Sequence, residues 1–147
     1  MSEGMSGIAS NVAVRPNEFR TTGSAVNRAV PVTALAEWQV RAIEKVASLD
    51  GLQPNWDSYG SQPTAEGAVR VAIGIIRASQ VDAVSIPRVV PMSGGGIHFD
   101  WSVGRKSFEF EVHSDSSIES LVCEDDTPVD PPPAKTFDAI LRWLTAA

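Results

Sequence analysis

Apolar and polar residues alternate along residues 97–112, which is the pattern of strands with one buried and one exposed face. The apolar positions are Ile97, Phe99, Trp101, Val103, Phe108, Phe110 and Val112. Gly104-Arg105 fits a two-residue type II′ turn with glycine first, which would set Trp101 opposite Phe108. The same register pairs Phe99 with Phe110 and Ile97 with Val112. The pattern therefore predicts a β-hairpin with every apolar side chain on one face.

Shorter extended segments flank this hairpin. Residues 86–90, which contain Pro87 and are followed by Pro91, are predicted to form an edge strand or a short extended piece, because proline cannot donate a hydrogen bond to a central ladder. Residues 92–96, Met-Ser-Gly-Gly-Gly, are predicted to form a flexible turn, and no Walker lysine follows the glycines to make a phosphate loop. A further strand is predicted over residues 118–123.

Helical spacing appears before and after the strands. The spacing predicts a first helix from an N-cap at Thr33 to Asp50-Gly51, and a second from Pro63-Thr64 to about Ser79. Thr136 is the expected N-cap of a short third helix. The apolar faces comprise Leu35, Trp38, Ala42, Val46 and Leu49 in the first helix, Ala68, Val69, Ala72, Ile73 and Ile76 in the second, and Phe137, Ile140, Leu141 and Leu144 in the third.

The order of these elements predicts an α+β fold. Two N-terminal helices, an antiparallel β-meander of three to four strands and a short C-terminal helix would form one domain over residues 33–147, with helices on the aromatic face of the sheet. Residues 125–135 are expected to be an acidic, proline-rich loop. Residues 1–32 show no sustained period and are expected to be an extended or disordered arm, through which a homo-oligomer could form.

Charge narrows the class of partner. The chain has 147 residues and a formal net charge of −6. Residues 107–147 contain nine acidic and two basic residues, which disfavours nucleic acid and favours a basic partner protein or a cation. The single cysteine, Cys123, is expected to be a small buried hydrophobe. No membrane-spanning run or secretory signal is recognisable, so a cytoplasmic location is expected.

The polar positions of the hairpin are the first candidate site. His98, Asp100, Glu109 and Glu111 would lie on one face, where they could bind a divalent metal or place a general acid beside a base. The competing interpretation, which the pattern favours, is a solvated face neutralised by Arg88 or Lys106. No nucleophile paired with a base is evident.

The turn-rich residues 55–63 between the first two helices are the second candidate. Asp57 is predicted to accept backbone hydrogen bonds in an Asx turn, and Gly60 to adopt a positive φ. Trp56 is expected to be largely buried between helix and sheet. Tyr59 is the better candidate for a partner contact, although Trp56, Asp57 and Tyr59 together make up the predicted partner-binding set.

These residues also carry a resemblance. Trp56-Asp57-Ser58-Tyr59-Gly60-Ser61-Gln62-Pro63, the Gly95-Gly96-Ile97 strand start, Trp101 and the Glu109-Phe110-Glu111-Val112 alternation resemble small uncharacterised bacterial and phage-encoded proteins. That group has a Trp-Asp-Gly-Tyr-Gly-Ala-x-Pro loop, so Ser58 and Ser61 depart from its pattern. The resemblance spans roughly residues 35–123 and implies a shared fold but no activity.

Two functions from different classes follow. The first is a non-catalytic protein-binding module, such as a regulator, inhibitor or assembly component, which needs no cofactor. The alternative is a small metal-dependent hydrolase that uses His98, Asp100, Glu109 and Glu111.

Overall fold

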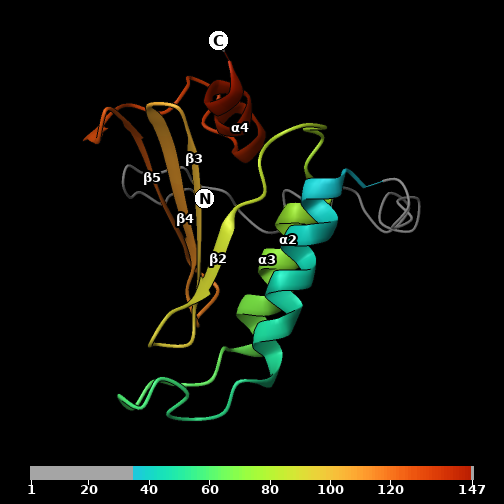
Figure 1. The fold of residues 1–147 in the computed structure, drawn as a ribbon, viewed down its shortest axis with the longest axis vertical. Coiled ribbons are helices and arrows are strands. Elements are labelled where there is room, and N and C mark those ends of the chain that lie inside the picture. The colour runs from blue at the N-terminus through green and yellow to red at the C-terminus, as the bar shows by residue number, and fades with distance from the viewer. Residues whose placement is uncertain (1–34, 147) are drawn as a thin grey trace.

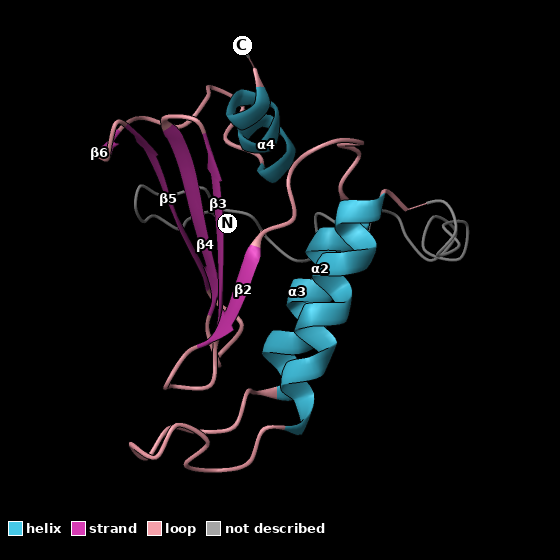
Figure 2. Cartoon of the chain, in the orientation of Figure 1, coloured by secondary structure: helices cyan, strands magenta, loops and turns pink. Residues whose placement is uncertain are grey.

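The computed structural model describes residues 35–146 and confirms the α+β fold. Figure 1 shows the described helices on one side of a twisted antiparallel sheet, and Figure 2 shows long loops joining the elements at the lower end. The strand order β2-β3-β4-β5-β6 is a simple meander. The elements in chain order are α2 (Glu37–Ala47), the 3₁₀ helix η3 (Ser48–Gly51), α3 (Glu66–Ala78), β2 (Arg88–Pro91), β3 (Ile97–Val103), β4 (Lys106–Val112), β5 (Ile118–Glu124), β6 (Thr127–Pro128) and α4 (Phe137–Thr145).

The predicted register of the central hairpin is confirmed. Trp101 faces Phe108, Phe99 faces Phe110, and Ile97 faces Val112. Gly104 adopts φ +61°, as the first position of a type II′ turn requires. All six of these apolar side chains are buried, so the hairpin contributes one complete wall of the core.

The outer strands are short. Strand β2 lies at one edge of the sheet, as its prolines predicted, and β6 at the other edge has two residues. Strand β6 lies inside the segment expected to be a loop. It forms because Asp125 and Asp126 both adopt positive φ, 54° and 63°, which is the geometry of a two-residue type I′ hairpin turn.

Helix boundaries differ from the sequence prediction at the N-terminal ends. Helix α2 begins at Glu37 with Ala36 as its N-cap residue, so Thr33 is not the cap. The Gln39 side chain accepts a hydrogen bond from the Ala36 amide at 2.7 Å, and its amino group donates to the Ile76 carbonyl at 2.8 Å. One buried glutamine thus stabilises the start of α2 and joins it to α3. Helix α4 does have Thr136 as its cap, as predicted.

Trp101 lies at the centre of the core. Its ring stacks on Phe108 with centroids 5.4 Å apart and meets the edges of Trp38 at 6.2 Å and Phe137 at 5.8 Å. Its indole N–H donates to the carbonyl of Ser85 at 3.0 Å. Trp101 therefore contacts α2, α4 and the sheet at once.

The glycine turn between β2 and β3 is part of a packed joint. Gly95 accepts a hydrogen bond from the Ala65 amide at 2.9 Å, and Ser93 accepts one from the Gln62 amide at 2.8 Å. Gly96 lies so close to β4 that a Cβ there would be 2.6 Å from the Val112 carbonyl oxygen. These glycines join the entry of α3 to the end of β4, a role that the predicted flexible turn did not include.

Two further expectations concern Cys123 and the N-terminal residues. Cys123 is half-buried, because the buried positions of β5 are Ile118, Ser120 and Val122 and Cys123 points to the opposite face. The prediction that it is buried was therefore wrong. The expected arm, residues 1–32, lies outside the described residues. Across the described part of the chain, no helix combines the length and apolar character needed to cross a bilayer.

Candidate functional site

The loop of residues 55–63 is held by its own side chains. Asp57 Oδ1 accepts from the Tyr59 amide at 2.9 Å, which is the predicted Asx turn, and the Ser61 hydroxyl donates to Oδ2. Asn55 Oδ1 accepts from the Gly60 amide at 2.6 Å. The Asn55 amide also donates to the Ser61 carbonyl at 2.8 Å, which closes the base of the loop. The loop is therefore a defined, hydrogen-bonded structure and not a slack connection.

Several loop residues adopt positive φ. Asn55 has φ 64°, Ser58 has φ 68° and Gly60 has φ 83°. Asn tolerates this region, whereas Ser at position 58 holds it at some cost in conformational energy. The surrounding hydrogen bonds supply the compensation, and the result is a fixed projection of the residue between them, Tyr59.

The two aromatic residues of the loop differ in exposure. Tyr59 is 90% exposed, the highest value among the large hydrophobic residues described. Trp56 is half-buried and does not belong to the core or to the side chains packed against it. Its indole N–H donates to the Gln62 carbonyl at 2.7 Å. The expectation that Trp56 is largely buried between helix and sheet was therefore wrong: Trp56 braces the loop itself.

We expect the loop to loosen in acid. The pKa of Asp57 lies below its ordinary value of 3.8, mainly because the Ser61 hydroxyl donates to the carboxylate and next because the Tyr59 amide does. A lowered folded-state pKa means that this stabilisation is complete above the unfolded value and disappears as the pH falls through the folded value. NMR titration of Ser61→Ala should show the Asp57 pKa rising toward 3.8. An unchanged midpoint would contradict the assigned cause.

The second candidate is the sheet face opposite the core, which we call the polar face. It carries the four residues predicted as an alternative catalytic or metal site. In the structure these four side chains have separate partners. His98 Nδ1 lies 2.9 Å from Glu111 Oε2, whereas Asp100 pairs with Arg88 at 3.5 Å. Glu109 faces Asp100 across the hairpin. The proposed roles of these residues stay predictions.

The sequence prediction named Arg88 or Lys106 as the cation that neutralises this face. Arg88 does pair with Asp100. Lys106 instead shares the face of Phe108 and Phe110, because residues two apart on a strand point the same way. Its ammonium group donates to the carbonyl of Trp143 at 2.8 Å. A cation at this position also stabilises the C-terminal end of α4 through the helix dipole.

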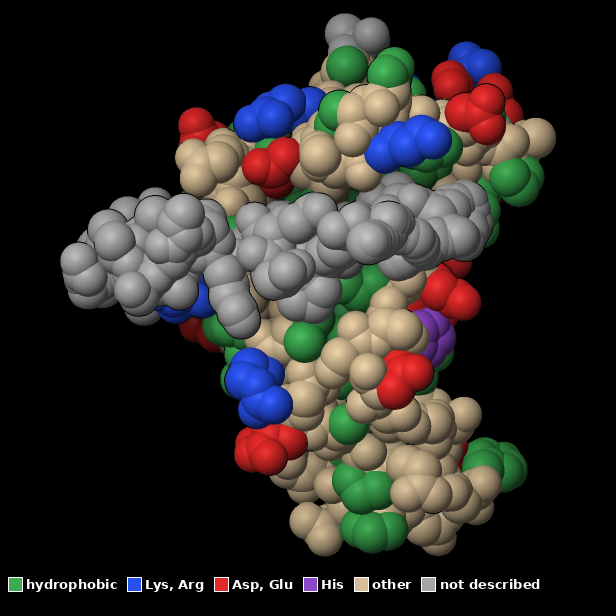
Figure 3. All heavy atoms as spheres, turned by 180° about the vertical axis from the view of Figure 1, so that it is seen from behind, with side chains coloured by type: hydrophobic (Ala, Val, Ile, Leu, Met, Phe, Trp, Pro, Cys, Tyr) green, Lys and Arg blue, Asp and Glu red, His purple; other side chains and the backbone are tan. Residues whose placement is uncertain are grey.

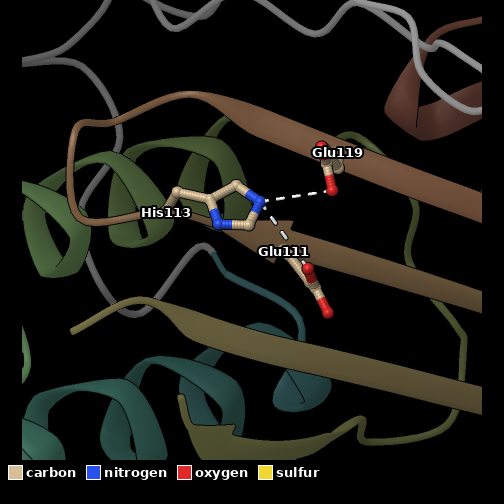
Figure 4. A group of neighbouring side chains, drawn as sticks. All are labelled: Glu111, His113 and Glu119. Atoms are coloured by element: carbon tan, nitrogen blue, oxygen red, sulfur yellow. Dashed lines mark ion pairs between the residues drawn. The ribbon is translucent and has the colours of Figure 1, made fainter. Parts of the chain in front are cut away.

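A group that the sequence prediction missed lies at the end of the polar face. Glu111, His113 and Glu119, which we call the histidine–glutamate cluster, have ligand atoms within 4.8 Å of one another. Figure 4 shows the His113 ring turned toward both carboxylates, with the glutamates on neighbouring strands. His113 Nε2 lies 3.6 Å from Glu111 Oε1 and 3.4 Å from Glu119 Oε1.

Register explains how the cluster forms. Glu111 and Glu119 are direct partners across β4 and β5, and His113 follows Glu111 by two positions on the same face. Alternation alone placed Glu111 and His113 together. The register of β5 against β4 was not predictable, because it depends on the turn of residues 114–117, where Ser116 adopts φ 72° and Asp115 accepts from the Ser117 amide.

Comparisons with protein-family models, curated proteins and solved structures found no match to this chain.

Proposed function

We propose that this protein is a non-catalytic protein-binding module that contacts its partner through Tyr59. The observation that carries the proposal is the combination of 90% exposure of Tyr59 with a loop that fixes its position. An exposed tyrosine on an ordered loop pays little conformational entropy on binding, and tyrosine is enriched among interface hot spots. A loop needed only to connect α2 and α3 would have no need for this projection.

The chemistry of the loop describes the partner. Residues 51–65 contain a single charged side chain, Asp57. In Figure 3 the lower end of the molecule, where the loop lies in Figure 1, is mostly uncharged polar and apolar surface. The partner is a protein with a pocket for the Tyr59 ring and a basic or N–H donor group facing Asp57. This module would regulate that partner, inhibit it or take part in its assembly.

Three further parts of the proposal rest on the sequence. The resemblance to small bacterial and phage proteins favours a bacterial or phage origin. The acidic excess of residues 107–147 favours a basic partner. Self-association through residues 1–32 is compatible with the same function.

Replacing Tyr59 should weaken partner binding without harming the fold. Tyr59→Ala is expected to change the free energy of unfolding by less than about 0.5 kcal/mol, because the side chain is exposed. It is expected to weaken partner binding by about 30-fold, which corresponds to the roughly 2 kcal/mol of a hot-spot residue. The measurement is quantitative affinity purification from cells of the source species, followed by titration of the recovered partner against the purified variants.

Ile86→Ala is the matched control. Ile86 is the other exposed large hydrophobic residue described, 44% exposed, and belongs to the connection between α3 and β2 instead of the 55–63 loop. A partner retained by Ile86→Ala and lost by Tyr59→Ala supports the proposal. Equal retention by both variants, or a wild-type protein that recovers no partner, overturns it.

The hydrolase alternative has less support from the geometry. Asp100 is occupied by Arg88, and His98 by Glu111, so the four predicted residues do not converge on one point. The polar face nevertheless contains a cluster with a different composition, for which metal binding alone is the simpler role.

A further inference from the structure

The geometry points to a Zn²⁺-type metal site formed by Glu111, His113 and Glu119, in which His98 contacts and orients the Glu111 carboxylate. This inference is independent of the proposed partner contact, because the cluster belongs to the polar face and not to the 55–63 loop. The first ground is electrostatic. Glu111 and Glu119 stand directly opposite each other, and like charges in that arrangement destabilise a sheet unless a cation or a basic side chain lies between them. A metal ion held by both carboxylates and by His113 would supply that positive charge.

The second ground is that the His113 ring has a buried nitrogen without a hydrogen-bond partner among the described residues. Its Nε2 atom is buried and makes no hydrogen bond to any residue between 35 and 146. It is nevertheless directed at two carboxylate oxygens, 3.4 and 3.6 Å away. A nitrogen and two carboxylate oxygens that converge without a hydrogen bond, all within 4.8 Å of one another, have the arrangement of ligands around a shared ion.

The third ground is the length of these separations. Zinc binds histidine nitrogen and carboxylate oxygen at about 2.0–2.2 Å in tetrahedral geometry, which sets neighbouring ligand atoms about 3.4 Å apart. The distances from His113 Nε2 match that edge closely. Octahedral Mg²⁺ at about 2.0–2.1 Å would need ligands about 3.0 Å apart, and both Mg²⁺ and Ca²⁺ prefer oxygen donors only.

His98 gives the site a second layer. Its Nδ1 lies 2.9 Å from Glu111 Oε2, which leaves Oε1 as the atom that faces His113. Ligating carboxylates are commonly oriented by such a hydrogen bond. His98 and His113 are the two histidines of the chain, so both imidazoles serve one site.

The backbone around His113 is fixed before any ion arrives. The His113 amide donates to the Ser117 carbonyl at 2.8 Å, and the His113 carbonyl accepts from the Ser116 amide at 2.8 Å. Three protein ligands leave one tetrahedral position, which water would fill. Glu119 is 62% exposed in its side chain, so an ion can reach the site from solvent.

Titration of the full-length, metal-free protein with Zn²⁺ alone tests the inference. Zn²⁺ is expected to raise the melting temperature and to shift the ring NMR signals of both histidines, whereas Mg²⁺ and Ca²⁺ do neither. Glu119→Gln and His113→Asn should weaken Zn²⁺ binding at least about 100-fold, and His98→Gln about 10–100-fold. Glu119→Gln is the variant that keeps its fold, because its side chain is largely exposed.

Two controls separate this site from incidental binding. Glu109→Gln removes a carboxylate from the same strand and face without touching the cluster, and Cys123→Ser removes the free thiol. Both are expected to bind Zn²⁺ as the wild type does. The inference is overturned if Zn²⁺ does not stabilise the protein, if Cys123→Ser abolishes binding, or if Glu119→Gln binds as tightly as Glu109→Gln. Loss of partner binding in Tyr59→Ala has no bearing on these outcomes.

Discussion

Trp101→Ala should lower the free energy of unfolding by about 4 kcal/mol, the largest loss expected from a single substitution in this protein. The indole is 1% exposed and contacts Trp38 of α2, Phe108 of β4 and Phe137 of α4. Its removal would leave a cavity where three elements meet and an unpaired carbonyl at Ser85. Urea unfolding followed by far-ultraviolet circular dichroism measures the change.

Trp101→Phe separates the two contributions. The phenyl ring fills most of the space but donates no hydrogen bond, so its loss should be smaller, about 1–3 kcal/mol. Tyr59→Ala is the matched aromatic truncation on the surface and should leave the midpoint almost unchanged. A Trp101→Ala protein as stable as Tyr59→Ala would contradict the assignment of Trp101 to the centre of the core.

Gly96→Ala should lower the free energy of unfolding by about 3 kcal/mol, near the upper end for added volume at a packed position. The new methyl group would lie 2.6 Å from the Val112 carbonyl oxygen and 3.1 Å from the His113 Cα atom. Both neighbours are backbone atoms, so no side-chain rotation can relieve the contact. The start of β3 or the end of β4 would have to move. The same urea titration reports the loss.

Gly94→Ala is the control within the same glycine run. A methyl group there meets nothing within 4 Å, and the position has no positive φ. Its stability should stay within about 1 kcal/mol of the wild type. Equal effects at positions 94 and 96 would show that the run needs flexibility in general and not a close approach at Gly96.

The sequence predicts the strands of the sheet far better than the contacts that join the sheet and helices to one another. Strict alternation around Gly104 determines the register of the hairpin, because a shift by one residue would expose every aromatic side chain. The four apolar positions of α4 are likewise all buried, and Thr136 caps it as predicted. These features depend on local period and turn chemistry, which are readable along the chain.

Long-range features are not readable in this way. Gln39 is buried because its side chain joins α2 to the carbonyls at the end of α3, 37 residues away, and nothing near position 39 announces that contact. Lys106 lies off the polar face for the same kind of reason, because its hydrogen-bond partner, the Trp143 carbonyl, is 37 residues further along the chain. Trp56 was misassigned although its partner, the Gln62 carbonyl, is only six residues away within the same loop.

The two candidate sites differ in the same respect. The Asx turn at Asp57 and the exposure of Tyr59 follow from a short segment, and both agree with the sequence prediction. The histidine–glutamate cluster requires the pairing of β5 with β4, which brings Glu119 opposite Glu111, so the set suggested by the sequence did not include Glu119. His113 shares the face of Glu111 by alternation alone and was left out of that set.

Photo-crosslinking from position 59 in living cells tests the proposed function most directly. A photoreactive phenylalanine analogue in place of Tyr59 keeps an aromatic ring on the same exposed loop, and the same analogue in place of Ile86 provides the control. The account predicts a discrete crosslinked protein from position 59 that is absent from position 86. No crosslink from position 59, or the same products from both positions, would contradict it.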